Sequence, residues 1–384
     1  MSFLCLILFC ASVAEAVTPD QVLKSAWTEK TYMALDEVQS TSSKNPFKAV
    51  EVSFTDERED SKSSFETEVK FQFKSYPEWK IGNGHENQKN LLKASSLGWA
   101  LKNRYSVILQ YELNRRKLER VAEALRLSDG YLKAQNLSLR AGKATSKNYL
   151  SAQNELYKLK RYQSGLQQEQ SQLEKKLKTW VKETDSSGLT SYNLVSVEEI
   201  GQVLQTNPTE SESLSKKLSD QEIKLMSEEL AIVKGRERQW VKSFDVAHVS
   251  KDEEDQYKIG VTFQIPTLGH DVLAKQKQND LLLKRALKQK EAEEAGDQLQ
   301  NLKVQILNLI ELYKNESKLS ELKVGSLDPL ANIERKIAME QEQIDLLNKH
   351  QEICYLYLDY LLESELLVKN PEKNYLEKSL QAAL

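Results

Sequence analysis

Residues 257–266 read YKIGVTFQIP, so apolar side chains alternate with Lys, Gly, Thr and Gln. A period of two is typical of a β-strand, because successive side chains point to opposite faces. Residues 65–74 read FETEVKFQFK and alternate in the same way. The rest of the chain is mostly polar with a helical pattern. The sequence therefore predicts strands that lie far apart in the chain and serve a common purpose.

The composition indicates an elongated helical protein. Charged residues make up 29% of the 384 residues, and the chain has only 7 Pro and 13 Gly. Leu, Lys, Glu, Gln and Ser dominate the long middle stretches, which favours extended helices over several globular domains. The formal net charge of −3 gives no general field that would attract a nucleic acid.

The first 16 residues, MSFLCLILFCASVAEA, resemble a secretory signal peptide. An apolar run is followed by Ala14-Glu15-Ala16, the small-x-small pattern of a cleavage site, and the run is too short to span a bilayer. Because it lacks the usual basic residue, either the signal is atypical or the true start lies elsewhere; the alternative is a buried N-terminal segment. Cleavage would remove Cys5 and Cys10 and leave Cys354 alone, without a disulfide.

The same order of predicted elements occurs twice. Each copy contains a helix, a strand, a charged turn, a second strand and then two long helices. The helix and the two strands are expected at 19–42, 47–55 and 65–74 in the first copy, and at 196–242, 244–250 and 257–265 in the second. The chain is therefore interpreted as an internal duplication.

This duplication predicts the domain boundaries. A first structural repeat covers 17–182 and a second covers 196–366, and a polar linker with turn-forming residues joins them at 183–195. Residues 1–16 form the signal peptide, and 367–384 form a C-terminal tail.

The break between the paired long helices carries the same signals in both copies. AGKATSKNYLSAQNEL starts at residue 141 and VGSLDPLANIERKI at residue 324. Gly142 and Gly325 suit the left-handed residue that ends a helix, and Thr145 and Asp328 suit the N-cap three positions later. Pro329 fits a first helical position. Each copy is thus predicted to contain a helical hairpin with a tight turn, and capping explains Asp328 better than a pore role.

Apolar spacing within the second hairpin predicts a coiled coil. Its seam steps by 3 and 4 residues on both helices, at Leu299, Leu302, Ile306, Leu309, Tyr313, Ile333, Ile337, Ile344 and Leu347. The arm from residue 85 to 140 would be roughly 80 Å long at a rise of 1.5 Å per residue. Such arms need partner helices, which copies of the same chain would supply.

The strands allow two interpretations. They form either a small soluble sheet that caps the helices or part of a membrane-spanning barrel with apolar side chains toward lipid. Four strands are too few to close a barrel, and open edges are costly in hydrocarbon, so a barrel requires an oligomer. The candidate lipid-facing residues are Phe65, Val69, Phe71, Phe73, Tyr257, Ile259, Val261, Phe263 and Ile265.

With these features, the sequence resembles the TolC-like outer membrane efflux proteins. The two repeats and IPTLG at 265–269, similar to the strand-to-helix crossover of that family, carry the resemblance. The most specific element is the turn pattern, with Gly followed by a Ser or Thr at +3, Asp at +6, apolar residues and then Ala-Gln. The first turn reads Gly142, Thr145, Asn148, Tyr149, Leu150, Ala152 and Gln153; the second keeps Gly325, Asp328, Asn332 and Ile333 but has Arg335 and Lys336 in place of Ala-Gln.

The resemblance implies a mainly α fold of duplicated long helical hairpins with two short β-hairpins. It implies a homotrimer whose strands form one twelve-stranded barrel in the outer membrane and whose helices form a periplasmic tunnel. Such a tunnel serves efflux or type I secretion together with a periplasmic adaptor protein and an inner-membrane pump. The tip and aperture candidates are Gly142, Thr145, Asn148, Tyr149, Gly325, Asp328, Ala331 and Asn332.

One departure concerns the aperture, where family members often carry Asp at +6 as an acidic ring. The corresponding residues here are Asn148 and Ala331. The strand hairpins and the arms are also shorter than is usual for the family.

The sequence gives no reason to expect an enzyme. His85, His248, His270 and His350 are scattered without the spacing of a metal site, and there is no phosphate-binding loop. We therefore expect no cofactor, catalytic residue or nucleic acid partner. The alternatives to a channel are a periplasmic coiled-coil scaffold with a small soluble sheet and a helical pore-forming protein secreted as a monomer.

Overall fold

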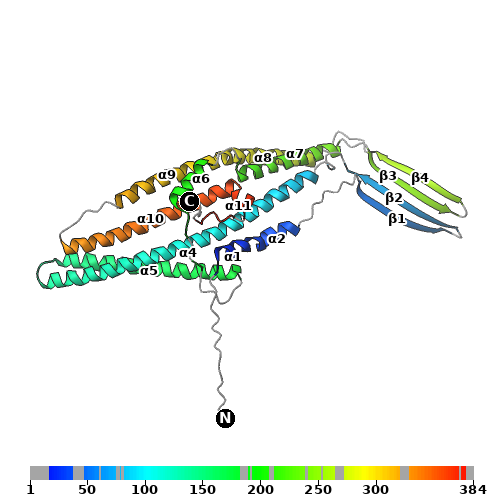
Figure 1. Ribbon diagram of the computed structural model, residues 1–384. Helices are drawn as coiled ribbons and strands as arrows, with labels where there is room; N and C mark the ends of the chain where they lie inside the picture. Colours follow the sequence, from blue (N-terminus) through cyan, green and yellow to red (C-terminus); the bar gives the residue numbers. More distant parts are fainter. Residues whose placement is uncertain are drawn as a thin grey trace, which may run out of the picture. The chain divides into compact units, whose positions relative to one another are not determined.

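The structure is a computed structural model. It describes residues 17–37, 47–59, 62–74, 78, 82–181, 189–190, 193–206, 212–237, 241–251, 254–263, 272–320, 328–371 and 373–377. The predicted signal peptide at 1–16 lies outside these residues. Two compact units make up the chain (Figure 1): one is formed from Met1–Met33, Ser96–Glu212 and Gln298–Leu384, and the other from Ala34–Ser95 and Ser213–Asp297.

The first unit is helical. It contains α1 (Pro19–Lys24), a short 3-10 helix (Ser25–Thr28), the start of α2 (Lys30–Glu37), most of α4 (Gly82–Arg140), α5 (Ser146–Val181), α6 (Val197–Thr206), α9 (Gln298–Ser320), α10 (Pro329–Glu363) and α11 (Leu366–Lys369). Its core includes Leu101, Ile108, Leu113, Ile353 and Leu358, all nearly fully buried. Among the described residues, no helix combines the length and the apolar character that crossing a membrane requires.

The coiled-coil prediction is largely confirmed. Helices α9 and α10 contact one another, and Leu299, Ile306, Ile337 and Ile344 of the predicted seam are buried. In the middle of α9, Ile310 is buried while Leu309 is only half-buried. The apolar face of α9 therefore passes from Ile306 to Ile310 by a step of four residues, as in an ordinary α-helix.

The second unit contains one four-stranded antiparallel sheet and the helices α7 (Leu214–Glu237) and α8 (Val272–Gly296), which contact one another, together with the end of α2 and the start of α4. The strands are β1 (Phe47–Glu59), β2 (Lys62–Phe73), β3 (Val241–Lys251) and β4 (Glu254–Phe263), in the order β1-β2-β3-β4. Because β2 pairs with β3, the strand hairpins of the two repeats join into a single sheet.

The strands are longer than the sequence predicted. The charged segments that were expected to be turns continue the ladders, with Glu59 opposite Lys62 and Lys251 opposite Glu254. Antiparallel pairing uses only backbone groups, so it does not require apolar side chains, and opposite charges across the strands favour it.

Three predicted helices are each divided. The first long helix of the second repeat is α8 and α9, which end and begin on either side of Asp297. The helix expected at 196–242 is α6 and α7, which end and begin on either side of Pro208; a proline disfavours helical backbone at the preceding residue. The helix expected at 19–42 is α1, a 3-10 turn and α2, with extended backbone at Glu29.

Candidate functional site

The register of the sheet places apolar residues of all four strands on one face. One row across the sheet is Val52, Val69, Val246 and Ile259; the neighbouring row is Val50, Phe71, Phe244 and Val261. A third row contains Phe54, Thr67, His248 and Tyr257, where the His248 and Tyr257 rings lie 4.8 Å apart. The pleat therefore forms a continuous apolar face from strands that are far apart in sequence.

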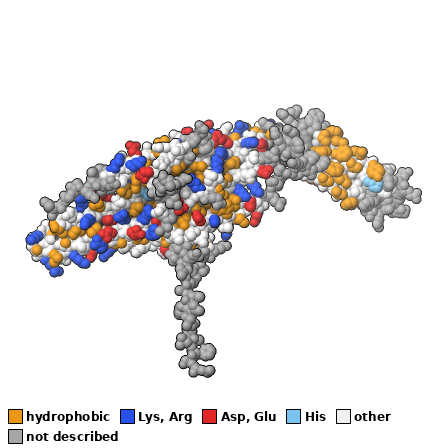
Figure 2. Space-filling view, in the orientation of Figure 1, with side chains coloured by type: hydrophobic (Ala, Val, Ile, Leu, Met, Phe, Trp, Pro, Cys, Tyr) orange, Lys and Arg blue, Asp and Glu red, His pale blue; other side chains and the backbone are white. Residues whose placement is uncertain are grey.

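This apolar face is exposed within the chain. Its outer strands are the most accessible, with Phe54 at 67%, Tyr257 at 74% and Ile259 at 70% of their full exposure. Apolar side chains cover much of the visible face of the sheet in Figure 2. An exposed, contiguous apolar surface of this kind marks an interface with a partner or a membrane.

The opposite face of the sheet is polar and internally paired. Gln72 Nε2 donates to Glu51 Oε1 at 2.7 Å, and Ser53 Oγ donates to Glu68 Oε2 at 3.3 Å. Gly260 lies opposite Asp245, and a Cβ at Gly260 would lie 1.9 Å from Asp245 Oδ2. Glycine there leaves space for the carboxylate, so the sheet separates an apolar from a polar environment.

Strands β1 and β4 are the two edges of this sheet. In the described part of the chain each pairs on one side only, β1 with β2 and β4 with β3. Long edges with unpaired N–H and C=O groups favour the addition of another strand. The sheet thus has an exposed apolar face and two edges that can accept a partner.

The α4–α5 turn forms as the sequence predicts. Gly142 has φ +69°. Its left-handed backbone lets the N–H groups of Lys143 and Ala144 donate to the Ser138 carbonyl at 2.8 and 3.2 Å. Thr145 Oγ1 then accepts from the Asn148 N–H at 3.3 Å as the N-cap of α5.

The start of α10 is also capped as predicted. The Asp328 carboxylate accepts from the Leu330 N–H at 3.0 Å, and Pro329 occupies the first turn. Ala331 and Asn332 follow in this turn and are half-buried. Gly325, the predicted turn residue, lies outside the described residues.

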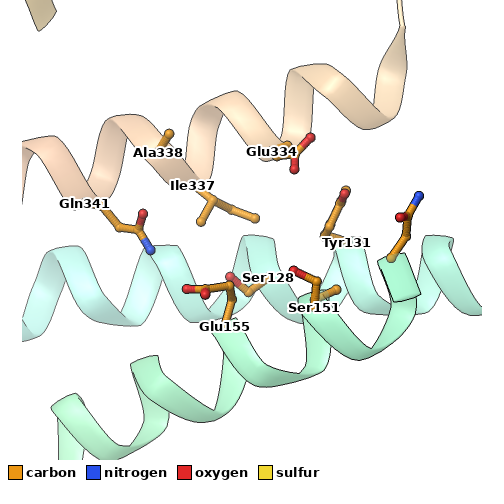
Figure 3. A pocket seen from close by; sticks show the side chains of 10 residues that line it. Ser128, Tyr131, Ser151, Glu155, Glu334, Ile337, Ala338 and Gln341 are labelled. Carbon is orange, nitrogen blue, oxygen red and sulfur yellow. The ribbon is translucent and has the colours of Figure 1, made fainter. Parts of the chain in front are cut away.

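A cleft of about 400 Å³ lies close to both helix starts, between α10 and the α4–α5 hairpin (Figure 3). Its lining carries two carboxylates, Glu155 from α5 and Glu334 from α10, and no basic side chain. The Glu334 carboxylate interacts with the Tyr131 hydroxyl and contributes to a raised pKa of Tyr131, although burial is the main cause. Asn148 also lines the cleft, so it connects the cleft to the predicted tip.

Several solved structures have a fold similar to that of this chain. CusC, studied for folding and transmembrane channel formation, superposes with a TM-score of 0.64 at 9% identity over 90% of this chain and 91% of its own. A membrane protein from Pseudomonas aeruginosa gives 0.60 at 8% identity over 90% of both chains. The outer membrane protein VceC from Vibrio cholerae gives 0.56 at 11% identity over 90% of this chain and 96% of its own.

The chain has the TolC-like fold. The resemblance stated from the turn motif and the predicted mainly α fold class are thereby confirmed at the level of the fold. No family model matches the sequence. No curated protein matches it either.

Within this TolC-like fold, most strand candidates lie on the apolar face. Val69, Phe71 and Phe73 alternate along β2, and Tyr257, Ile259, Val261 and Phe263 alternate along β4. Phe65 is in β2 opposite Asp56, but its side chain and all of Ile265 lie outside the described residues.

Sequence reasoning missed the residues that β1 and β3 add to this face. These are Val50, Val52 and Phe54 on β1, and Phe244 and Val246 on β3. For β1 the sequence contained the necessary pattern, because apolar side chains in KAVEVSFT at 48–55 alternate with a period of two.

Two groups that carry no apparent chemistry are buried in the helical unit. His350 Nε2 lies 3.0 Å from the Val195 carbonyl oxygen, and burial lowers the pKa of His350. Burial also raises the pKa of the Cys354 thiol to about 12, so it is not a reactive thiolate. Among the described residues, no group of His, Cys, Asp and Glu side chains is arranged to bind a metal.

Proposed function

We propose that this chain is one subunit of a trimeric outer membrane channel that serves efflux or type I secretion. Three copies contribute four strands each to a twelve-stranded barrel, and their helices form a periplasmic tunnel. The tunnel works with a periplasmic adaptor protein and an inner-membrane pump. Each structural repeat, 17–182 and 196–366, supplies one strand hairpin and one helical hairpin.

The amphipathic sheet carries this proposal. Hydrocarbon accepts its apolar face, but it does not accept the unpaired backbone groups of β1 and β4. Pairing β4 of one copy with β1 of the next satisfies both edges and closes the barrel. The strands contain 10 to 13 residues, which meets the roughly 9 to 11 residues of a tilted membrane strand. The TolC-like fold supports the same assembly, since OprN, another structural neighbour, is an outer-membrane channel.

The helices independently require partners. Large apolar side chains are exposed along several of them, including Leu137 at 68%, Tyr157 at 70%, Leu283 at 65% and Leu287 at 57%. In a helical tunnel, neighbouring copies would cover such surfaces. The apolar face of the sheet and the apolar stripes of the helices are thus explained by one assembly.

The proposed trimer also gives a function to the residues of the α4–α5 turn and of the start of α10. Gly142 and Thr145 shape the α4–α5 turn, and Asp328 and Asn332 shape the start of α10. We assign this end to the aperture and to adaptor docking. Asn148, Tyr149, Ala331 and Gly325 remain candidates for the same aperture.

The first experiment determines where the protein resides and how many chains it contains. Detergent extraction of a fractionated outer membrane, with crosslinking and mass measurement, is expected to give three chains. A soluble monomer or dimer would contradict the channel. It would favour the periplasmic scaffold, in which the sheet packs against a soluble partner.

A matched pair of β4 variants tests which face of the sheet contacts lipid. Ile259→Asp/Val261→Asp places two charges on the apolar face and is expected to abolish outer membrane assembly, at a cost of up to about 2 kcal/mol per charge. Gln256→Asp/Thr262→Asp places two charges on the opposite face of the same strand and should assemble normally. Normal assembly of both variants would exclude lipid contact for this face.

A further inference from the structure

The α4–α5 turn is unusually basic. Residues 130–154 contain Lys133, Arg140, Lys143 and Lys147 but no Asp or Glu. Arg140, Lys143 and Lys147 are exposed, and in the described part of the chain none of them forms an ion pair. We name these three side chains the basic collar. Lys and Arg side chains are visible at this end of the helical unit in Figure 2.

The carboxylates nearest to the basic collar are already engaged. Asp129 pairs with Lys133 at 2.6 Å, and Glu155 pairs with Lys158 at 2.7 Å. On α10, Asp328 caps the helix and Glu334 interacts with Tyr131. Asp129 and Glu155 are therefore neutralised by other lysines; Asp328 and Glu334 keep their negative charge, but in the described part of the chain neither forms an ion pair with the basic collar.

Helix stability does not explain the basic collar. Arg140 in the last turn of α4 interacts favourably with the helix dipole, but Lys147 in the first turn of α5 does so unfavourably. The end of α4 and the start of α5 have opposite dipole charges that lie side by side and largely cancel. The sign of the potential at the turn is therefore decided by its side chains.

We propose that the basic collar makes the aperture select anions, so that the cargo of this channel is anionic. This inference rests on the proposed function, which assigns the turn to the aperture. The positions where the resemblance places acidic residues, Asn148 and Ala331, carry no charge to oppose it. Three copies of the collar around one opening would concentrate anions there, because screening at physiological salt extends over about 8 Å.

The local potential is measured first, without assuming a channel. In a background with Cys5→Ser and Cys10→Ser, the remaining thiol is Cys354, which is fully buried. Ser146→Cys places a thiol at the turn, and Ser171→Cys places one at an exposed position of α5. At each site, the rate of reaction with an anionic methanethiosulfonate is divided by the rate with a cationic one. Because both reagents react with the same thiolate, this ratio does not depend on the thiol pKa of the site.

The ratio of anionic to cationic rates is expected to be about tenfold higher at residue 146 than at 171, and to fall in 0.5 M KCl. Arg140→Gln/Lys143→Gln/Lys147→Gln should remove the difference. The control Lys277→Gln/Lys284→Gln/Lys290→Gln removes three exposed charges from α8, away from both labelled sites in sequence, and should leave this difference unchanged. Equal ratios at residues 146 and 171 would overturn the proposal.

Selectivity is then measured as the reversal potential of the purified trimer in a planar bilayer under a KCl gradient. The expected result is a permeability ratio of chloride to potassium of about 3, which falls toward 1 in the triple Gln variant of the collar. A conducting trimer without anion preference would overturn the anion selectivity alone. A protein that forms no channel would overturn both the proposed function and the selectivity.

Discussion

At the scale of single residues, Gly142 decides the turn of the first helical hairpin. Its φ of +69° costs an L-residue with a Cβ about 1 kcal/mol, so Gly142→Ala should lower the melting temperature by a few degrees. Gly165→Ala in the middle of α5 is the control: its Cβ meets nothing within 4 Å, and alanine favours a helix. Circular dichroism melts should therefore move in opposite directions, and an unchanged or higher melting temperature for Gly142→Ala would contradict this role.

His350 predicts the pH dependence of the helical unit. Burial lowers its pKa in the folded state, with a smaller contribution from Arg116, whereas the hydrogen bond to the Val195 carbonyl and, more weakly, Glu198 oppose the shift. The unfolded chain therefore takes up a proton near pH 6.5 before the folded chain does, and the free energy of unfolding falls as the pH drops below that value. His350→Gln retains an N–H donor for the Val195 carbonyl but does not titrate. Its melting temperature should fall less than that of the wild type between pH 7.5 and 5.0; equal falls would show that His350 is not responsible.

At the scale of an element, α4 has a polar seam in its buried face. Asn114, Lys117, Ser128 and Gln135 are nearly fully buried, and only part of their hydrogen-bonding capacity is used. Lys117 Nζ donates to Gln351 Oε1 of α10 at 2.6 Å, whereas Ser128 Oγ has no hydrogen-bond partner among the described residues. The α4–α10 contact is therefore less stable near the tip than apolar residues would make it.

Replacement of a single serine tests this reading of α4. Ser128→Ala removes a buried hydroxyl without a partner and should raise the free energy of unfolding by about 1 kcal/mol. Ser25 provides the matched control, because its buried hydroxyl donates to the Val22 carbonyl at 2.7 Å. Ser25→Ala should destabilise the protein by about 1 kcal/mol. Denaturant titration measures both, and a destabilised Ser128→Ala would show that this hydroxyl is satisfied.

At the scale of the whole molecule, the proposed trimer requires contact between the edge strands of different copies. Cysteines at Val52 in β1 and at Tyr257, Ile259 or Val261 in β4, tested in turn, should form disulfides between chains in outer membranes. The ladder on a non-reducing gel should end at three chains. Cysteines at Val69 and Val246, which already face each other within one chain, serve as the control and should give no such ladder. If every edge pair also stays monomeric, the closed barrel is wrong.

The sequence by itself determined the local elements. Alternation in FETEVKFQFK and YKIGVTFQIP identified β2 and β4, and Gly142 with Thr145 and Asp328 with Pro329 identified the helix ends. These features depend on φ preferences, capping and periodicity, all of which act over a few residues. The turn motif also indicated the TolC-like fold, although no family model matches the sequence.

Only the tertiary structure decided how these elements combine. Periodicity cannot tell which strands pair, so the β2–β3 ladder that joins the two repeats and aligns Val69 with Val246 required the fold. The cleft between α10 and the α4–α5 hairpin likewise depends on residues more than 200 positions apart, such as Tyr131 and Glu334. The structure was also needed to show that, among the described residues, neither Lys143 nor Lys147 pairs with a carboxylate. Contacts at long sequence separation are set by the burial of whole faces, which no local pattern specifies.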